Sequence, residues 1–327
     1  MRLKTPVAVT LAWALPVYRV RPVLPIVLLL LFLCAPALSA EEDALHRFEQ
    51  AVVESAQTQS DLERARRVRQ AFDRDVSPLL ERPGPVDVER ARRLFGAAHA
   101  AYFYTLADDV LTAMEEAFLH LRRLDGAGKA DAALMFDALV GGRRFARARA
   151  LAGEFGLPPP MRVDAAPAEP VAQPMAIRFL SDRRAAVEQW RQAGVGLVVV
   201  VHPGCGFSRR AVEAIGQDPQ LVGWIREHGS LLVPQNLTGD LEPIARWAIA
   251  NDGLPIRLAY RREGFPFFAH WATPTFYVMR DGVVVTRLDG WPDGATTASL
   301  RAALRVAGLN LGGDVSMPPV PARAGTR

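Results

Sequence analysis

Cysteine is scarce in this chain, since Cys34 and Cys205 are its two thiols among 327 residues. That number excludes a disulfide-stapled scaffold, and it also excludes a structural metal site built from cysteine alone, which needs several thiolates close together. Lysine is nearly absent too, because every basic residue except Lys4 and Lys129 is an arginine. We attribute that bias to genome composition rather than to function.

Acidic residues are missing from the first forty positions, which hold four basic ones: Arg2, Lys4, Arg19 and Arg21. From Glu41 onward, 35 basic residues balance 35 acidic residues. The high isoelectric point of about 9.4 therefore belongs to the amino-terminal segment. A body without net charge has no broad field to attract phosphates, so we expect no nucleic-acid partner.

Residues 1–40 have the order of a secretory signal peptide: a positively charged start, an apolar stretch over 23–33 and small residues over 35–40. The apolar stretch is short for a membrane-spanning helix. We expect cleavage after Ser39 or Ala40 and a periplasmic or otherwise exported protein. The alternative is that the segment is retained as a membrane anchor. Lipid attachment at Cys34 is disfavoured, because Leu33 stands where a small residue is needed.

Residues 41–156 predict an all-α helical domain, either a bundle or a superhelical array. Apolar residues recur at helical spacing over 62–72, 88–95, 106–121, 130–139 and 145–155, with short breaks between them. The segment after Gly142 weakly resembles the second helix of a tetratricopeptide-type hairpin, although the full repeat signature is absent.

The composition changes after Gly156. Residues 157–174 are rich in proline and alanine and predict an extended linker. Beyond them we expect strands at 175–180, 196–201 and 231–234, helices at 182–192, 241–251 and 297–307, and a hairpin over 275–287 with an Asp-Gly turn. Residues 175–310 therefore predict an α/β domain with a central mixed sheet, followed by a disordered tail at 311–327.

The most informative motif surrounds Cys205, which follows a buried strand and a His-Pro-Gly turn at the point where a helix begins. A helix amino terminus presents unpaired N–H groups and the positive end of the helix dipole, and both favour a thiolate. We expect the thiol pKa to lie below the free value of about 8.5. His202 could stabilise the thiolate or carry a proton, or it could be only a solvated turn residue. Arg209 and Arg210 either add positive charge to the site or form a solvated face.

The strand-turn-Cys-x-x-Ser-helix order, together with Thr273-Pro274-Thr275 before a final hairpin and helix, resembles the thioredoxin-like superfamily over residues 175–310. The resemblance implies a cis peptide bond at Pro274 that packs against the Cys205 sulfur. It also implies that backbone at Thr273 and Pro274 holds a cysteine-containing segment of a partner. The extra residues from about 234 to 271 resemble the insertions of periplasmic thiol-disulfide exchange members.

Ser208 stands where that family usually has a second cysteine, so an internal active-site disulfide cannot form. The sequence from Cys205 to Ser208 is identical to the active site of monothiol glutaredoxins, which bind iron–sulfur clusters with glutathione. Their Gly-Gly glutathione motif is not evident here, and the leader argues for export. We therefore expect neither a cofactor nor a metal.

Two hypotheses from different classes follow. In the first, the chain is an envelope thiol-disulfide exchange protein with Cys205, Ser208 and His202 as its reactive group and neighbours and with Thr273 and Pro274 as its substrate-binding residues. Its partner would be a cysteine-containing envelope protein or a glutathione-like thiol. In the second, Cys205 is a remnant and the chain is a redox-inactive binding or adaptor protein whose helical domain binds partners. The sequence leaves open whether the protein is an enzyme.

Overall fold

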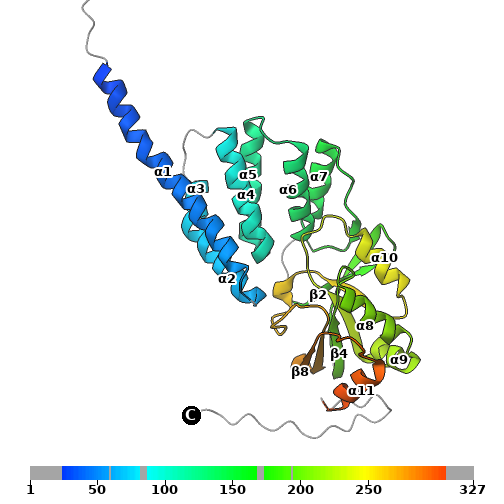
Figure 1. Ribbon diagram of the computed structural model, residues 1–327. Coiled ribbons are helices and arrows are strands. Elements are labelled where there is room, and N and C mark those ends of the chain that lie inside the picture. The colour runs from blue at the N-terminus through cyan, green and yellow to red at the C-terminus, as the bar shows by residue number, and fades with distance from the viewer. Residues whose placement is uncertain (1–23, 59, 82–86, 168–172, 193, 307–327) are drawn as a thin grey trace, which may run out of the picture. The chain divides into compact units, whose positions relative to one another are not determined.

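The structure is a computed structural model that describes residues 24–58, 60–81, 87–167, 173–192 and 194–306 (Figure 1). It divides into two compact units, with the boundary in the sequence between Ala44 and Leu45. In the described part of the chain, no helix combines the length and the apolar character needed to cross a membrane. Part of the predicted leader, residues 1–23, and the whole predicted tail, 311–327, lie outside the described residues. Cleavage and export stay predictions.

The first part of the chain is helical, as predicted (Figure 1). The elements are α1 (Leu24–Ser55), α2 (Asp61–Ala71), the π-helical turn η1 (Phe72–Val76), α3 (Ser77–Glu81), α4 (Val88–Thr105), α5 (Asp108–Arg123), α6 (Lys129–Gly141) and α7 (Phe145–Phe155). The side chain of Asp87 caps α4 by accepting the Arg90 N–H at 2.7 Å. Small residues such as Ala91 and Ala98 are buried on α4, which lets it pack closely against α5.

The second part is an α/β region built on one mixed sheet with the strand order β1-β3-β2-β6-β5-β4-β7-β8. Its strands are β1 (Arg162–Asp164), β2 (Met175–Phe179), β3 (Arg184–Gln189), β4 (Val195–Val200), β5 (Gly229–Val233), β6 (Ile256–Ala259), β7 (Thr275–Arg280) and β8 (Val283–Asp289). Strands β4, β5 and β6 run parallel, and β7 is antiparallel to both β4 and β8. A helical region followed by an α/β region with a central mixed sheet is the fold class that the sequence predicts.

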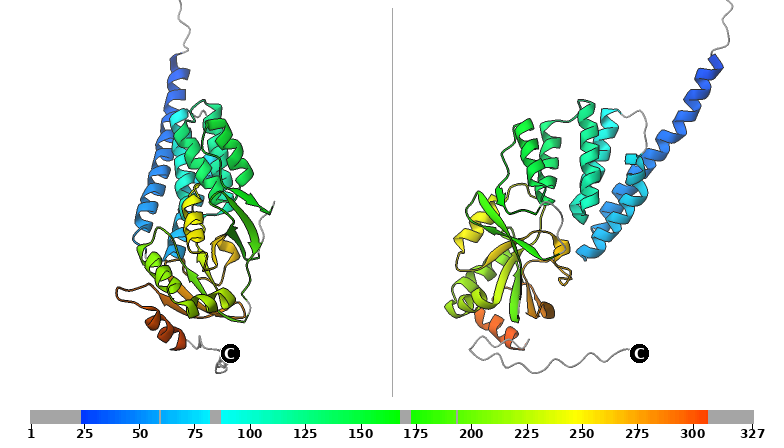
Figure 2. Two further views of the ribbon diagram at one scale, coloured as in Figure 1. Left: turned by 90° about the vertical axis from the view of Figure 1, so that its right-hand side faces the viewer. Right: turned by 180° about the vertical axis from the view of Figure 1, so that it is seen from behind.

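The two faces of the sheet are covered differently. Helices α8 (Gly206–Gly216) and α9 (Pro219–His228) cover one face (Figures 1 and 2), and α9 packs on β4 and β5. On the other face, Val198 and Val200 of β4 pack in an aromatic cluster with Trp190, Phe265 and Tyr277. Alternate side chains of a strand point to opposite faces, so β4 is buried on both, as its unbroken apolar run predicts. Further elements are α10 (Glu242–Ala250), the 3-10 turn η2 (Arg262–Gly264) and α11 (Thr297–Val306).

One local prediction is wrong: residues 182–192 do not form a helix but contain β3, which pairs with β1 and β2. The Ala, Glu and Gln content of this segment favours a helix. Ala185 and Val187, however, alternate with more exposed neighbours, and this two-residue period suits an outer strand. Pairing with the sheet outweighs the weak local propensity. Sequence reasoning also missed β6, α9 and β1, the last of which lies within the predicted linker range.

Candidate functional site

Cys205 stands at the junction of the central strand and the first helix of the α/β region. Strand β4 ends at Val200, a turn follows, and Cys205 is the N-cap residue of α8. Its N–H donates to the His202 carbonyl at 3.0 Å, and its own carbonyl accepts the Arg209 N–H at 3.0 Å, which is the first helical hydrogen bond. The side chain is partly exposed. The thiol is therefore fixed at the amino end of α8 while remaining accessible.

The surroundings of Cys205 act on its thiol pKa in opposite directions. Burial raises the pKa, whereas hydrogen bonds from the Ser208 backbone, the Thr273 and Ser208 side chains and the Phe207 backbone lower it, and the net effect is a pKa below the ordinary value. These donors stabilise the negative charge of a thiolate, as the first N–H groups of a helix do. In the thiol form, Sγ instead donates to the Thr273 carbonyl oxygen at 3.1 Å.

Thr273 and Pro274 lie next to this thiol, although they belong to a much later part of the sequence. The bond between them is cis, and the Thr273 carbonyl contacts Sγ, so the predicted cis bond beside Cys205 is confirmed. The register of the sheet explains the meeting, because Val200 at the end of β4 lies opposite Thr275 at the start of β7. The Pro274 carbonyl is occupied, since it accepts the Gly290 N–H at 2.8 Å.

An aromatic loop that sequence reasoning missed holds the chain just before Thr273. The Tyr277 hydroxyl donates to the His270 carbonyl at 2.6 Å and accepts the His270 N–H at 3.1 Å. The ring of Phe268 lies 4.6 Å from that of Tyr277, centroid to centroid. The run of phenylalanines between Gly264 and Trp271 was the available signal. This cluster ties the loop to β7 and so positions Thr273.

Ser208 lies in the first turn of α8, as its spacing from Cys205 predicts. Its side chain is completely buried, and in the thiol form its hydroxyl has no hydrogen-bond partner among the described residues. A buried hydroxyl without a partner is costly. That cost falls when the sulfur becomes a thiolate that can accept the hydroxyl proton, which agrees with the lowering effect of Ser208 on the pKa of Cys205.

His202 is half-buried, and its Nδ1 accepts the Gly204 N–H at 3.0 Å. Burial lowers the pKa of the ring below its ordinary value. The neutral tautomer with the proton on Nε2 fits this bond, because Nδ1 must be an acceptor. A neutral ring adds no positive charge beside the thiol, and with Nδ1 accepting the Gly204 N–H it has no free nitrogen to take up a proton, so this geometry supports neither of the two active roles expected for His202.

The two arginines that follow the motif are held by local contacts. Arg209 donates to the Pro203 carbonyl at 2.7 Å. Arg210 pairs with Asp293 at 3.0 Å and lies 4.6 Å from the centroid of the Phe207 ring. Phe207 is about half exposed, at 49%, and sits two residues from Cys205. The surface beside the thiol therefore combines an aromatic face with a guanidinium.

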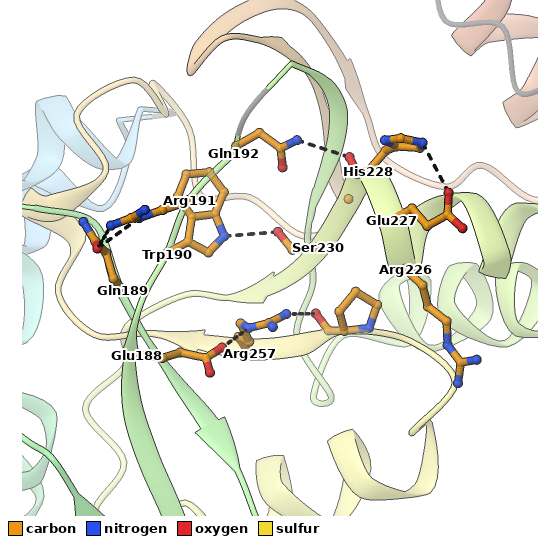
Figure 3. Close-up of a pocket in the computed structure, with 12 residues that line it drawn as sticks. Glu188, Gln189, Trp190, Arg191, Gln192, Arg226, Glu227, His228, Ser230 and Arg257 are labelled. Carbon is orange, nitrogen blue, oxygen red and sulfur yellow. Dashed lines mark hydrogen bonds and ion pairs between the residues drawn. The ribbon is translucent and has the colours of Figure 1, made fainter. Parts of the chain in front are cut away.

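No three His, Cys, Asp or Glu side chains in the described part of the chain gather closely enough to hold a metal ion. A cavity of about 400 Å³ lies elsewhere, lined by polar residues that include Glu188, His228 and Arg257 (Figure 3). It adjoins Gly229, where β5 begins, whereas Cys205 follows the end of β4, and these two strands are parallel. The cavity is therefore at the opposite end of the strands from the thiol and is not part of this site.

Neither a protein-family model nor a curated protein matches the chain. Among solved structures, a thioredoxin-like protein from Bacteroides caccae ATCC 43185 is similar, with 13% sequence identity and a TM-score of 0.28. The similarity covers 72% of this chain and 82% of that one. A TM-score this low carries no information about the site.

Proposed function

We propose that the protein carries out thiol-disulfide exchange through the single thiol of Cys205, in the cell envelope. The observation that carries the proposal is the position of the Cys205 sulfur, which lies at the amino terminus of α8 and 3.1 Å from the Thr273 carbonyl of the cis Thr273–Pro274 pair. A partly exposed thiol whose pKa is lowered by N–H and hydroxyl donors reacts readily with disulfides near neutral pH.

The proposed reaction has two steps. The Cys205 thiolate attacks one sulfur of a partner disulfide, a bond forms between the two sulfurs, and the partner's other sulfur leaves as a thiolate. A second thiolate, from the partner or from a glutathione-like molecule, then attacks the mixed disulfide and releases Cys205. The partner disulfide is the oxidant and the second thiol is the reductant. The proton of the Cys205 thiol passes to water when the thiolate forms.

The partner segment would lie beside Thr273 and Pro274. Phe207 and Arg210 follow Cys205 in α8, and their side chains lie against each other, so an aromatic or acidic residue next to the partner's cysteine would add contacts. The proposal of export rests on the leader sequence alone, and the alternative is that this segment is retained as a membrane anchor.

The test is the rate at which Cys205 is alkylated by iodoacetamide between pH 5 and 9. The proposal expects a rate that rises through a pKa below that of free cysteine, together with a mixed disulfide when oxidised glutathione is added. The Cys205→Ser variant reports any reaction at Cys34. A thiol that titrates at or above the value of free cysteine and forms no mixed disulfide would reject the proposal.

A second function is favoured by one specific observation: Cys205 is the single cysteine in the sequence of the α/β region, and Ser208 stands where a resolving thiol would be. In that case the α/β region is a binding module that holds extended segments beside Pro274 without turnover. Peptide binding that is unchanged in Cys205→Ser would favour it over exchange.

A further inference from the structure

A polar cavity of about 490 Å³ lies where the helical region meets the end of β6. Residues from the start of α5, the turn before α7 and the segment after β6 line it, and four of them are arginines: Arg143, Arg144, Arg147 and Arg261. None of these residues belongs to the thiol site. The cavity is therefore a separate feature from the thiol site.

The positive charge of this cavity is only half balanced. Arg144 pairs with Asp108 at 3.2 Å and with Glu115, Arg147 pairs with Glu115 at 2.7 Å, and Arg261 pairs with Asp108 at 3.2 Å. Two carboxylates are thus shared among four guanidiniums. Among the residues that the structure describes, these contacts leave about two positive charges in excess.

Arg143 is the deepest of the four, with 6% of its surface exposed. Its guanidinium donates to the Tyr260 carbonyl at 2.5 Å, the Ala259 carbonyl at 2.7 Å and the Val140 carbonyl at 3.4 Å. Burial lowers its pKa to about 10. No carboxylate of the described residues lies within ion-pair distance of it, and a buried cation without a counter-charge is costly.

The amino terminus of α7 opens into the same cavity, where Phe145, Ala146 and Arg147 form its first turn. The first N–H groups of a helix have no partner within it, and here no side chain caps them and no acidic residue occupies the first turn. In addition, the Nε of Arg261 is buried without a hydrogen-bond partner in the described part of the chain. The uncapped amino end of a helix and the guanidiniums of the lining arginines therefore meet in one cavity.

We propose that this cavity binds a phosphoryl group, either free phosphate or the phosphate of a small ester. A phosphate monoester carries about two negative charges at neutral pH, which matches the excess. Guanidiniums and a helix amino terminus are the donors that bind such a group best. The site goes beyond the thiol chemistry proposed above and does not depend on it.

The experiment measures the thermal unfolding midpoint of the full chain against the concentration of inorganic phosphate, of glycerol 2-phosphate and of succinate, at one ionic strength set with potassium chloride. A ligand that binds the folded state raises the midpoint as its concentration exceeds the dissociation constant. We expect a saturable rise of the unfolding midpoint with phosphate or with its ester. Whichever of the two binds more tightly shows whether the site takes free phosphate or an esterified phosphate. Succinate is expected to have little effect.

Two variants locate the site. Arg147→Gln removes one guanidinium from an exposed position, 66% of whose side chain is accessible, and is expected to weaken phosphate binding about tenfold. Ala146→Asp places a carboxylate at the first turn of α7. It is expected to raise the midpoint without ligand, as an acidic residue at a helix amino terminus does, and to abolish the response to phosphate.

The controls are Ala146→Asn, which is neutral, and Arg149→Gln, which removes a guanidinium of α7 that does not line the cavity. Both should keep the wild-type response. The proposal is overturned if phosphate and its ester act no differently from chloride, if succinate alone raises the midpoint, or if Ala146→Asp and Arg147→Gln respond as the wild type does.

Discussion

The Sγ atom of Cys205 lies 3.1 Å from the carbonyl oxygen of Thr273, although 68 residues separate the two in the sequence. The antiparallel pairing of β4 with β7 brings them together, because each residue sits just outside its strand at the same end of the sheet. The thiol thus lies between a helix amino terminus and a backbone segment whose position depends on a different part of the chain. The reactivity of the Cys205 thiol should therefore change when the segment that holds Thr273 is altered.

Tyr277→Phe tests this dependence. The change removes a hydroxyl that makes two hydrogen bonds to the His270 backbone, and it leaves the His270 carbonyl and N–H without that partner. We expect the free energy of unfolding in urea to fall by about 1–3 kcal/mol. The alkylation rate of Cys205 should also change, because the loop before Thr273 loosens.

Tyr104→Phe is the matched control, since Tyr104 makes no hydrogen bond through its hydroxyl among the described residues and lies on α4. It should leave both quantities near the wild-type values. If Tyr277→Phe lowers stability without altering the alkylation rate, the aromatic loop supports the fold but does not position the thiol site.

The sequence alone predicts much of this region, for identifiable reasons. The β-branched run of β4 and the Asp-Gly turn between β7 and β8 are strong local signals. The cis bond at Pro274 follows from the resemblance to a known superfamily. The composition of residues 184–189 misleads, because their strand exists through pairing with distant partners. The roles of Tyr277 and of Arg143 depend on contacts with residues distant in the sequence, and no local sequence pattern predicts them.

The neutral state of His202 has a consequence for stability at acidic pH. Burial lowers the pKa of this ring in the folded protein, whereas in the unfolded chain it titrates near 6.5. As pH falls below about 6.5, the unfolded chain takes up the proton first, so the free energy of unfolding decreases until the folded ring is protonated too. The free energy of unfolding of His202→Asn, measured in urea titrations, should therefore decrease less steeply than that of the wild type between about pH 7 and 5.

His270→Asn, a change at an exposed ring, serves as the control and should retain the wild-type pH dependence. His99 also has a pKa lowered by burial, so part of the acid sensitivity will remain in every variant. An unchanged slope in His202→Asn would mean that this ring is equally protonated in both states.

Export is predicted from the order of charge, apolar stretch and small residues in positions 1–40. Intact mass of the protein recovered from the cell envelope should correspond to a chain beginning at Ala40 or Glu41. Envelope material that still begins at Met1 would instead support a retained anchor. Recovery in the cytosol alone would contradict export, while leaving the proposed chemistry of Cys205 to be judged by its own test.

The last prediction concerns the missing second thiol. Ser208 lies in the first turn of α8, three residues after Cys205, and residues so spaced on a helix lie close on one face. Their Cα atoms are then about 5–6 Å apart, within the range that a disulfide spans. A cysteine at 208 could attack a mixed disulfide on Cys205 from inside the molecule, and the second step would no longer need an outside thiol.

We therefore expect Ser208→Cys to form an internal disulfide under oxidising conditions, seen by mass spectrometry as a loss of two hydrogens, and to reduce protein disulfides with faster turnover than the wild type. The wild type should accumulate mixed disulfides. Ser208→Ala separates the effects, because it removes the hydroxyl without adding a thiol. It should raise the pKa of Cys205 without the gain in turnover expected for Ser208→Cys. If both thiols of Ser208→Cys stay free although Cys205 is reactive, the sulfur at 208 does not face Cys205, and the binding-module hypothesis becomes the better explanation.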